Sequence, residues 1–442
     1  MKLSLSCFAF LALAVASALC APDARALDMT HPHGVHRSRT VQPRTVAKRH
    51  GGASTAHAAS SHATTKAKAT ATRVTGARAT RATARTTTAH GRVRAASGLR
   101  RRHAIYERFT AASFVTTAQG EGDITAGEDP TIRAAALDAL GNMNGTVVVI
   151  NPANGRILAM VNQKLALSPG AEPCSTIKLS VGLAALSEGL ITRDTMLNLG
   201  GWRMNLTEAL AHSNNVYFET LGRELGFARV RHYATEFGLG ELAGWNISGE
   251  QLGTYPDHEL PASEGGVGRM CSFGQGVSMT PLQLGALVAA IANGGTLYYL
   301  QHPNSPGEVA DFQPKVKRTL SIAKYIPDMQ DGMAGAVEYG TARSLRVNFH
   351  ELPVFGKTGT CSNAGTRYGW FASYSDSPMG PLVSVFFLEG GRAVFGPRAA
   401  ELTGLFYRSL WDRNYFTGKP AAIQANASVG AASLASGMAV RH

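Results

Sequence analysis

A serine and a lysine stand three residues apart at Ser175 and Lys178, and these are residue types that serve as a nucleophile and its base. Residues at positions i and i+3 lie on one face of a helix, so the Lys178 amine can reach the Ser175 hydroxyl. Lysine has a reference pKa of about 10.4 and acts as a base only where burial or a second cation lowers that pKa. The pair therefore predicts an activated serine that forms an acyl-enzyme.

The same spacing occurs a second time, at Ser321 and Lys324. Two residue types at a fixed spacing recur by chance in a chain of 442 residues, so the pattern alone proves little. No partner motif lies between this second pair and Lys357. We interpret Ser321 and Lys324 as surface polar residues.

Two further motifs follow Ser175 along the chain. Ser213 and Asn215 supply a second hydroxyl and a side-chain amide, and Lys357 opens the run Lys-Thr-Gly-Thr on a late strand. Ser-x-x-Lys, Ser-x-Asn and Lys-Thr-Gly in this order form the signature of the serine enzymes that recognise penicillin. The presence of all three motifs in this order indicates that Ser175 and Lys178, unlike a chance pair, are catalytic.

With these motifs, residues 132–412 resemble the transpeptidase domain of penicillin-binding proteins, particularly the monofunctional kind. Cys174 stands where glycine is usual in that family. We expect neither the amino-terminal pedestal domain usual in the family nor a glycosyltransferase domain. The resemblance extends to residues 172–178, 208–215, 273–276, 280–284, 340–342 and 370–372.

The resemblance implies a role for each residue of the first two motifs. Ser175 attacks the carbonyl between the two terminal D-alanines of a peptidoglycan stem peptide, releases D-alanine and becomes acylated. Lys178 accepts the serine proton, and Ser213 relays a proton to the leaving amine. Asn215 holds Lys178 and the substrate amide. β-Lactams that acylate Ser175 are the implied inhibitors.

The resemblance also implies how the third motif binds substrate. Lys357 attracts the terminal carboxylate, and Thr358 or Thr360 hydrogen-bonds it. Gly359 lets an extended peptide lie against the strand as an added edge. The backbone N–H groups of Ser175 and Thr360 form the oxyanion hole, where loss of one donor typically costs about 3 kcal/mol.

The elements that position these residues follow the order hairpin, helices, strands. Two apolar runs, 146–151 and 157–161, flank an Asn-Gly turn and predict a β-hairpin. Apolar spacing predicts helices over 175–188, 206–225 and 280–293, and strands over 353–360, 368–374 and 382–388. We expect an α+β fold in which the first and last strands share one antiparallel sheet flanked by helices, with an all-helical subdomain.

The net charge of +13 is concentrated in one segment. Residues 27–110 carry 17 Lys and Arg against two acids, whereas residues 111–442 carry three more acids than bases. The basic segment nearly lacks Leu, Ile and Phe, so it cannot bury enough apolar surface to fold. We predict a disordered basic linker over 27–115, the catalytic domain over 116–415 and a disordered tail over 416–442.

The first 26 residues have the pattern of an export signal, with Lys2, an apolar run over 3–20 and a small-residue end. We therefore expect an extracytoplasmic protein of the periplasm or cell envelope, with the signal either cleaved or kept as a membrane anchor. The basic linker is either a solvated spacer or a tether to anionic envelope polymers. Export disfavours nucleic acid as its partner.

Three cysteines remain after the signal, namely Cys174, Cys271 and Cys361. An odd number outside the cytoplasm allows at most one internal bridge and leaves a free thiol. Cys174 and Cys361 adjoin the two oxyanion-hole donors and are expected to lie close together. We favour small buried side chains over a bridge between them.

Two other functions stay open. A serine β-lactamase needs fast deacylation, but no convincing glutamate motif is found, and Asn215 stands where the class with a carbamylated lysine has a branched apolar residue. A non-catalytic penicillin or peptidoglycan sensor is disfavoured because every reactive position is intact. We predict no metal and no cofactor. Transpeptidase and carboxypeptidase differ only in the entering nucleophile, so both remain alternatives.

Overall fold

The computed structural model describes residues 111–417. The predicted export signal, the basic linker up to residue 110 and the tail from residue 418 lie outside the described residues. The predicted domain boundaries therefore stay predictions. Between residues 111 and 417, no helix combines the length and the apolar character needed to cross a membrane.

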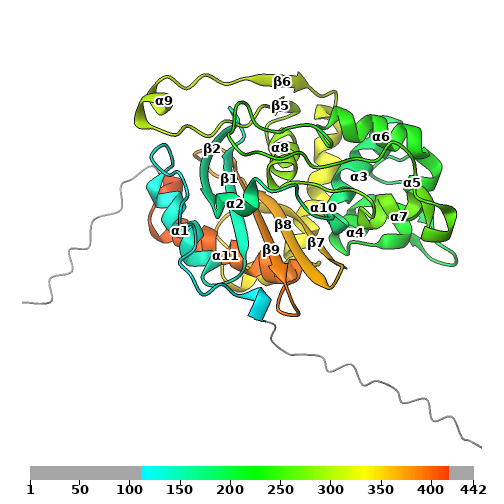
Figure 1. The fold of residues 1–442 in the computed structure, drawn as a ribbon. Coiled ribbons are helices and arrows are strands. Elements are labelled where there is room, and N and C mark those ends of the chain that lie inside the picture. Colours follow the sequence, from blue (N-terminus) through cyan, green and yellow to red (C-terminus); the bar gives the residue numbers. More distant parts are fainter. Residues whose placement is uncertain (1–110, 418–442) are drawn as a thin grey trace, which may run out of the picture. The chain divides into compact units, whose positions relative to one another are not determined.

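One antiparallel sheet of five strands, in the order β2-β1-β9-β8-β7, organises the fold (Figure 1). The N-terminal hairpin pairs with the last strand, where Val148 lies opposite Val385. This confirms the expected α+β fold with the first and last strands in one sheet. The strands are β1 (Gly145–Asn151), β2 (Arg156–Val161), β7 (Val354–Asn363), β8 (Thr366–Ser375) and β9 (Leu382–Gly390).

Both faces of the sheet are covered by helices. Helix α8 packs on one face, and helices α1 and α11 pack on the other. Val148 and Ile150 of β1 belong to the core with α8, whereas Val147 and Val149 belong to the core with α1 and α11. Burial on both faces explains why β1 is a continuous apolar run rather than an alternating one. The three helices are α1 (Pro130–Leu140), α8 (Pro281–Ala292) and α11 (Gly396–Asp412).

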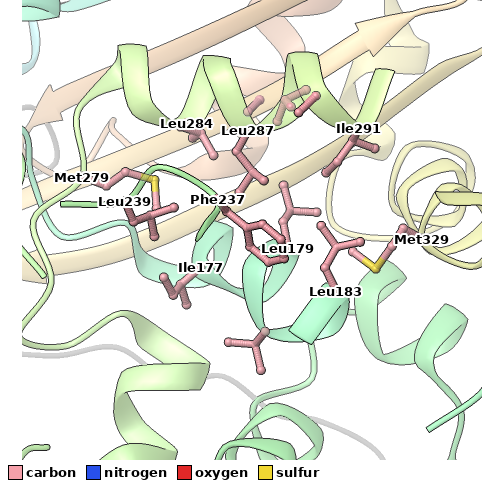
Figure 2. Close-up of a cluster of buried hydrophobic side chains, with 14 of the residues drawn as sticks. Ile177, Leu179, Leu183, Phe237, Leu239, Met279, Leu284, Leu287, Ile291 and Met329 are labelled. Atoms are coloured by element: carbon pink, nitrogen blue, oxygen red, sulfur yellow. The ribbon is translucent and has the colours of Figure 1, made fainter. Parts of the chain in front are cut away.

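A group of helices lies on the β7 side of the sheet (Figure 1). Leu183 of α3, Leu287 of α8 and Met329 of α10 share one apolar cluster, which joins α3 to α8 and α10 (Figure 2). The group comprises α3 (Lys178–Ser187), α4 (Leu206–Ala211), α5 (Asn215–Leu225), α6 (Phe227–Glu236), α7 (Gly266–Phe273) and α10 (Ile326–Glu338).

The remaining elements are short. Two small hairpins and two short helices are β3 (Leu197–Asn198) with β4 (Arg203–Met204), β5 (Thr296–Tyr298) with β6 (Val316–Thr319), α2 (Gln163–Ala166) and α9 (Pro306–Ala310). Single 3-10 turns occur at Ala111–Ser113, Cys174–Ile177, Ala262–Glu264, Ala323–Tyr325, Arg343–Val347 and Tyr415–Thr417.

The predicted helix over 280–293 is confirmed as α8. Its first turn is fixed by a capping box in which Thr280 and Gln283 each bond the backbone of the other. The helix predicted over 175–188 is also present, but its first turn is the 3-10 turn Cys174–Ile177, and α3 continues from it.

The helical stretch predicted over 206–225 is present, but as two helices, because α4 ends at Ala211 and α5 begins at Asn215. Ser213 between them has a φ of 54°, in the left-handed region that a helix interior does not accept. The side chain of Asn214 caps α5 by accepting the Tyr217 N–H. The Ser-x-Asn motif is therefore a break between two helices.

Candidate active site

Ser175 and Lys178 meet where the 3-10 turn passes into α3. Nζ of Lys178 lies 3.1 Å from Oγ of Ser175. Lys178 is fully buried, whereas Ser175 keeps part of its surface exposed. The fold thus places the predicted base within hydrogen-bond reach of a hydroxyl that a substrate can approach.

The Lys178 amine also faces two carbonyl oxygens. Its Nζ lies 2.7 Å from the backbone oxygen of Ser213 and 2.7 Å from Oδ1 of Asn215. Carbonyl oxygens only accept hydrogen bonds, so they can take both N–H groups of a neutral amine. The lone pair of that amine is then left for the Ser175 hydroxyl, which is the arrangement that a base requires.

The surroundings of Lys178 favour the neutral amine. Burial lowers the pKa of Lys178 well below its ordinary value, and the charge of Lys357 lowers it further. Glu219 of α5 acts in the opposite direction. Because burial is the largest cause, the low dielectric around α3 does more to create a base here than repulsion from the second lysine.

Ser213 joins the second motif to the third. Its Oγ lies 3.1 Å from Nζ of Lys178 and 2.8 Å from Nζ of Lys357. Its backbone oxygen also contacts Lys178, and both contacts depend on the left-handed backbone at this residue. A helical Ser213 would send its carbonyl along the helix axis instead.

The Lys-Thr-Gly-Thr run lies on β7, which is an edge strand of the sheet. Lys357 is fully buried, and burial lowers its pKa to about 7. A Cβ added to Gly359 would lie 2.9 Å from the backbone oxygen of Pro173. Only glycine therefore lets β7 approach the nucleophile turn this closely.

The two threonines of this run point to the opposite face of β7 from Lys357. Thr358 is buried and donates from its hydroxyl to Oγ1 of Thr341 at 2.7 Å. Thr360 is an exposed residue, and its Oγ1 accepts the N–H of Gly396 at 2.7 Å. Thr341 received no role from the sequence, although the segment 340–342 was part of the resemblance.

Cys174 and Cys361 form a disulfide, with their Cα atoms 5.5 Å apart. The favoured expectation of two separate small side chains was wrong, because the close approach of β7 at Gly359 brings both cysteines within bridging range. Their expected proximity is confirmed, and among residues 111–417 the one free thiol is that of buried Cys271. Cys174 has a φ of 52°, a conformation that favours the glycine usual in the family.

The second Ser-x-x-Lys pair is a surface feature, as predicted. Ser321 and Lys324 are both exposed, and the Lys324 amine lies over the ring of Tyr325. In the part of the chain from 111 to 417, no three His, Cys, Asp or Glu residues gather in a way that could hold a metal ion.

Comparison with known proteins agrees with the class that this fold and these motifs define. The family model described as "Penicillin binding protein transpeptidase domain" matches residues 145–389, which is more than half of the chain. The chain belongs to this family.

Two curated relatives show how far the similarity extends. Stage V sporulation protein D of Bacillus subtilis is 29% identical over 314 residues, which cover 59% of this chain and 48% of the relative. Peptidoglycan D,D-transpeptidase MrdA of Acinetobacter baumannii is 23% identical over 351 residues, which cover 62% of this chain and 52% of the relative. The chain thus spans about half the length of these relatives.

Two solved structures share the fold. A peptidoglycan glycosyltransferase from Burkholderia ambifaria has a TM-score of 0.56 at 17% identity and covers 67% of this chain and 99% of its own. The D,D-transpeptidase domain of a peptidoglycan glycosyltransferase from Eggerthella lenta has a TM-score of 0.52 at 20% identity, and the match covers 65% of this chain and 82% of that domain's chain. At these identities the similarity shows the fold alone.

Proposed function

We propose that this protein is a serine acyl-enzyme that acts on peptidoglycan stem peptides ending in D-alanyl-D-alanine, as a D,D-transpeptidase or a D-Ala-D-Ala carboxypeptidase. The contact that carries the proposal is the 3.1 Å approach of Lys178 Nζ to Ser175 Oγ, in surroundings that favour the neutral amine. A relative in the same family is named a peptidoglycan D,D-transpeptidase, which supports this substrate class.

Acylation begins at the Ser175 hydroxyl. Its oxygen forms a bond to the carbonyl carbon between the two D-alanines while its proton passes to Nζ of Lys178. The carbonyl oxygen becomes an oxyanion, which the backbone N–H groups of Ser175 and Thr360 stabilise. When the C–N bond breaks, the leaving amine takes a proton through the Ser213 hydroxyl, and D-alanine departs.

Deacylation repeats these steps in reverse with a new nucleophile. An amine of a second stem peptide, or a water molecule, attacks the ester carbon and gives a proton to Lys178. The Ser175 oxygen leaves and recovers a proton. The amine yields a cross-link, and water yields a trimmed peptide, so the entering group alone separates transpeptidase from carboxypeptidase.

Substrate binding uses the edge of the sheet. An extended peptide adds to β7 as a further strand, since β7 is an edge strand and Gly359 lets that strand lie close to the nucleophile turn. Lys357 attracts the terminal carboxylate. Thr358 already donates its hydroxyl to Thr341, whereas the Thr360 hydroxyl only accepts from Gly396, so Thr360 is the better donor to that carboxylate.

The proposed location is extracytoplasmic, in the periplasm or cell envelope. The Cys174–Cys361 disulfide supports it, since structural disulfides persist mainly in oxidising compartments. The export pattern in residues 1–26 points the same way. We also propose that the positive charge of the basic linker attaches it to anionic polymers of the envelope.

Covalent labelling with a fluorescent penicillin tests the proposal. We expect Ser175→Ala to abolish the label, and Ser321→Ala, in the surface pair of the same spacing, to label like the wild type. Absence of label on the wild type would refute the acyl-enzyme. Label lost within seconds as hydrolysed product would favour a β-lactamase, and a purely non-catalytic sensor would retain penicillin but leave muropeptides unchanged by mass spectrometry.

A further inference from the structure

A pocket of about 540 Å³ adjoins the nucleophile turn near the Asn363 end of β7. Thr360, Cys361, Ser362 and Asn363 of β7 form one wall. The other walls come from Glu172, which precedes the nucleophile turn, and from the end of α7 with the residues that follow it. The acylation steps described above use none of these charged side chains.

The pocket holds one positive and one negative group that are not paired with each other. Arg269 lies with its guanidinium 4.0 Å from the centre of the Phe273 ring, and its Nε donates to Oε1 of Gln275 at 3.4 Å. Among the described residues, neither the Arg269 guanidinium nor the Glu172 carboxylate has an ion-pair partner. The outer N–H groups of Arg269 and both oxygens of Glu172 therefore remain available to a ligand.

The two charges still influence each other across the pocket. Burial raises the pKa of Glu172, and the charge of Arg269 partly opposes this effect. A half-buried carboxylate without a hydrogen-bond donor is unfavourable, and an ammonium group in the pocket would relieve it.

The walls of the pocket are fixed in place. A Cβ on Gly274, directly after α7, would lie 2.4 Å from Cγ of Pro173, so the helix end abuts the nucleophile turn. The Cys174–Cys361 disulfide joins the same turn to β7. Arg269 and Glu172 are therefore held at a set distance from Ser175, as a specificity site requires.

The position of the pocket relative to the substrate follows from the proposed function, on which this inference rests. The terminal carboxylate lies at Lys357 and the reacting carbonyl at Ser175 and the Thr360 N–H. A peptide strand that runs from its terminal carboxylate at Lys357 to its reacting carbonyl at Thr360 continues along β7, past Cys361 toward Asn363. The side chain of the residue before the two D-alanines then lies at the pocket.

We propose that this pocket binds the head group of that third stem-peptide side chain and prefers one that carries both an ammonium and a carboxylate, as in a diamino-dicarboxylic acid. Arg269 binds the carboxylate through its outer N–H groups, in the bidentate geometry that guanidinium favours. Glu172 binds the ammonium. Lysine at the same position offers only the ammonium and loses the contact to Arg269.

The test compares two synthetic pentapeptides that end in D-alanyl-D-alanine and differ only in the third residue, which is meso-diaminopimelate or L-lysine. We expect wild-type kcat/KM to be higher for the diaminopimelate peptide. Arg269→Gln should lower kcat/KM for the diaminopimelate peptide by about 10- to 100-fold. Its kcat/KM for the lysine peptide should stay within about twofold of the wild-type value. Glu172→Gln should lower both values. Arg231→Gln, in an exposed arginine of α6, is the matched control.

A second arm changes the substrate instead of the protein. A peptide whose diaminopimelate side-chain carboxylate is amidated should react with the wild type like the lysine peptide. Penicillin labelling of every variant reports separately on Ser175. The pocket assignment is wrong, and the acyl-enzyme stands, if the labelled wild type has the same kcat/KM for all three peptides. The same conclusion follows if Arg269→Gln lowers kcat/KM equally for the diaminopimelate and the lysine peptide. If the wild type takes no label, both proposals fall.

Discussion

Lys178 and Lys357 converge on one hydroxyl, since Oγ of Ser213 lies 3.1 Å from the first amine and 2.8 Å from the second. Two buried ammonium groups this close to one atom repel each other, so the protonated pair is unfavourable and the two amines titrate as a unit. One neutral and one charged lysine is the arrangement that the site favours near neutral pH. The proposed division into a base and a carboxylate binder follows from it.

The pH dependence of acylation should report both lysines. The rate constant kcat/KM for a D-Ala-D-Ala peptide should rise as Lys178 loses its proton, at a pH well below the ordinary lysine value, because only the neutral amine is a base. It should fall above about pH 7 as Lys357 loses its charge. Stopped-flow or steady-state rates between pH 5 and 10 would measure the profile. A peptide with its terminal carboxylate blocked as an amide should lose only the alkaline fall.

Lys357 should lower the stability of the fold at neutral pH. In the unfolded chain a lysine keeps its proton up to a pH of about 10.4. In the folded protein Lys357 loses its proton near pH 7. Between these values the unfolded state binds more protons, so the free energy of unfolding rises with pH. Lys357→Met should be more stable than wild type by about 1–3 kcal/mol at pH 6.5.

That advantage should shrink at pH 9.5, as measured by urea unfolding at both pH values. Lys324→Met, in the exposed lysine of the surface pair, is the control and should show no pH-dependent gain. A Lys357→Met advantage that is the same at both pH values would mean that the lysine stays charged in the folded protein throughout this range.

Ser213 should be a site where activity and stability oppose each other. Its φ of 54° favours glycine, so Ser213→Gly should be about 1 kcal/mol more stable than Ser213→Ala. Both variants lose the hydroxyl that contacts the two lysines and should label poorly with penicillin. Chemical denaturation of the two variants measures the difference. Equal stability would show that the left-handed backbone costs nothing here.

The disulfide should stabilise the fold and keep the nucleophile turn against β7. Cys361→Ala should lower the free energy of unfolding by about 2–5 kcal/mol. Cys174→Gly also removes the bridge but should cost less, because glycine suits the φ of 52° at that position. Thermal unfolding with and without reductant checks this. Reductant should lower the Tm of the wild type and leave both variants unchanged.

The motif order was enough to predict which residues meet, because Ser175, Lys178 and Lys357 each lie on an element with a clear apolar pattern. The same pattern does not locate the break at Ser213. Apolar spacing reports which residues seek burial, and it runs without interruption through the break between α4 and α5. No periodicity encodes a single left-handed residue.

The disulfide and the charged pocket were beyond the sequence for a different reason. The distance between Cys174 and Cys361 depends on how closely β7 approaches the nucleophile turn, and that approach is set by tertiary packing at Gly359. Likewise, Glu172 and Arg269 face one pocket only because the end of α7 abuts Pro173. Contacts of this kind join segments that are far apart in the sequence, and their sequence separation does not indicate how close they lie in the folded protein.

The Cys174–Cys361 bridge closes a covalent ring, with a sequence separation of 187 residues between its two cysteines. Ser175, Lys178, Ser213 and Lys357 all lie inside that ring. A single proteolytic cut within it, for example in the mostly exposed stretch 257–265, would leave both pieces joined and every catalytic group still attached to the sheet. Only a cut combined with reduction would separate the nucleophile from β7.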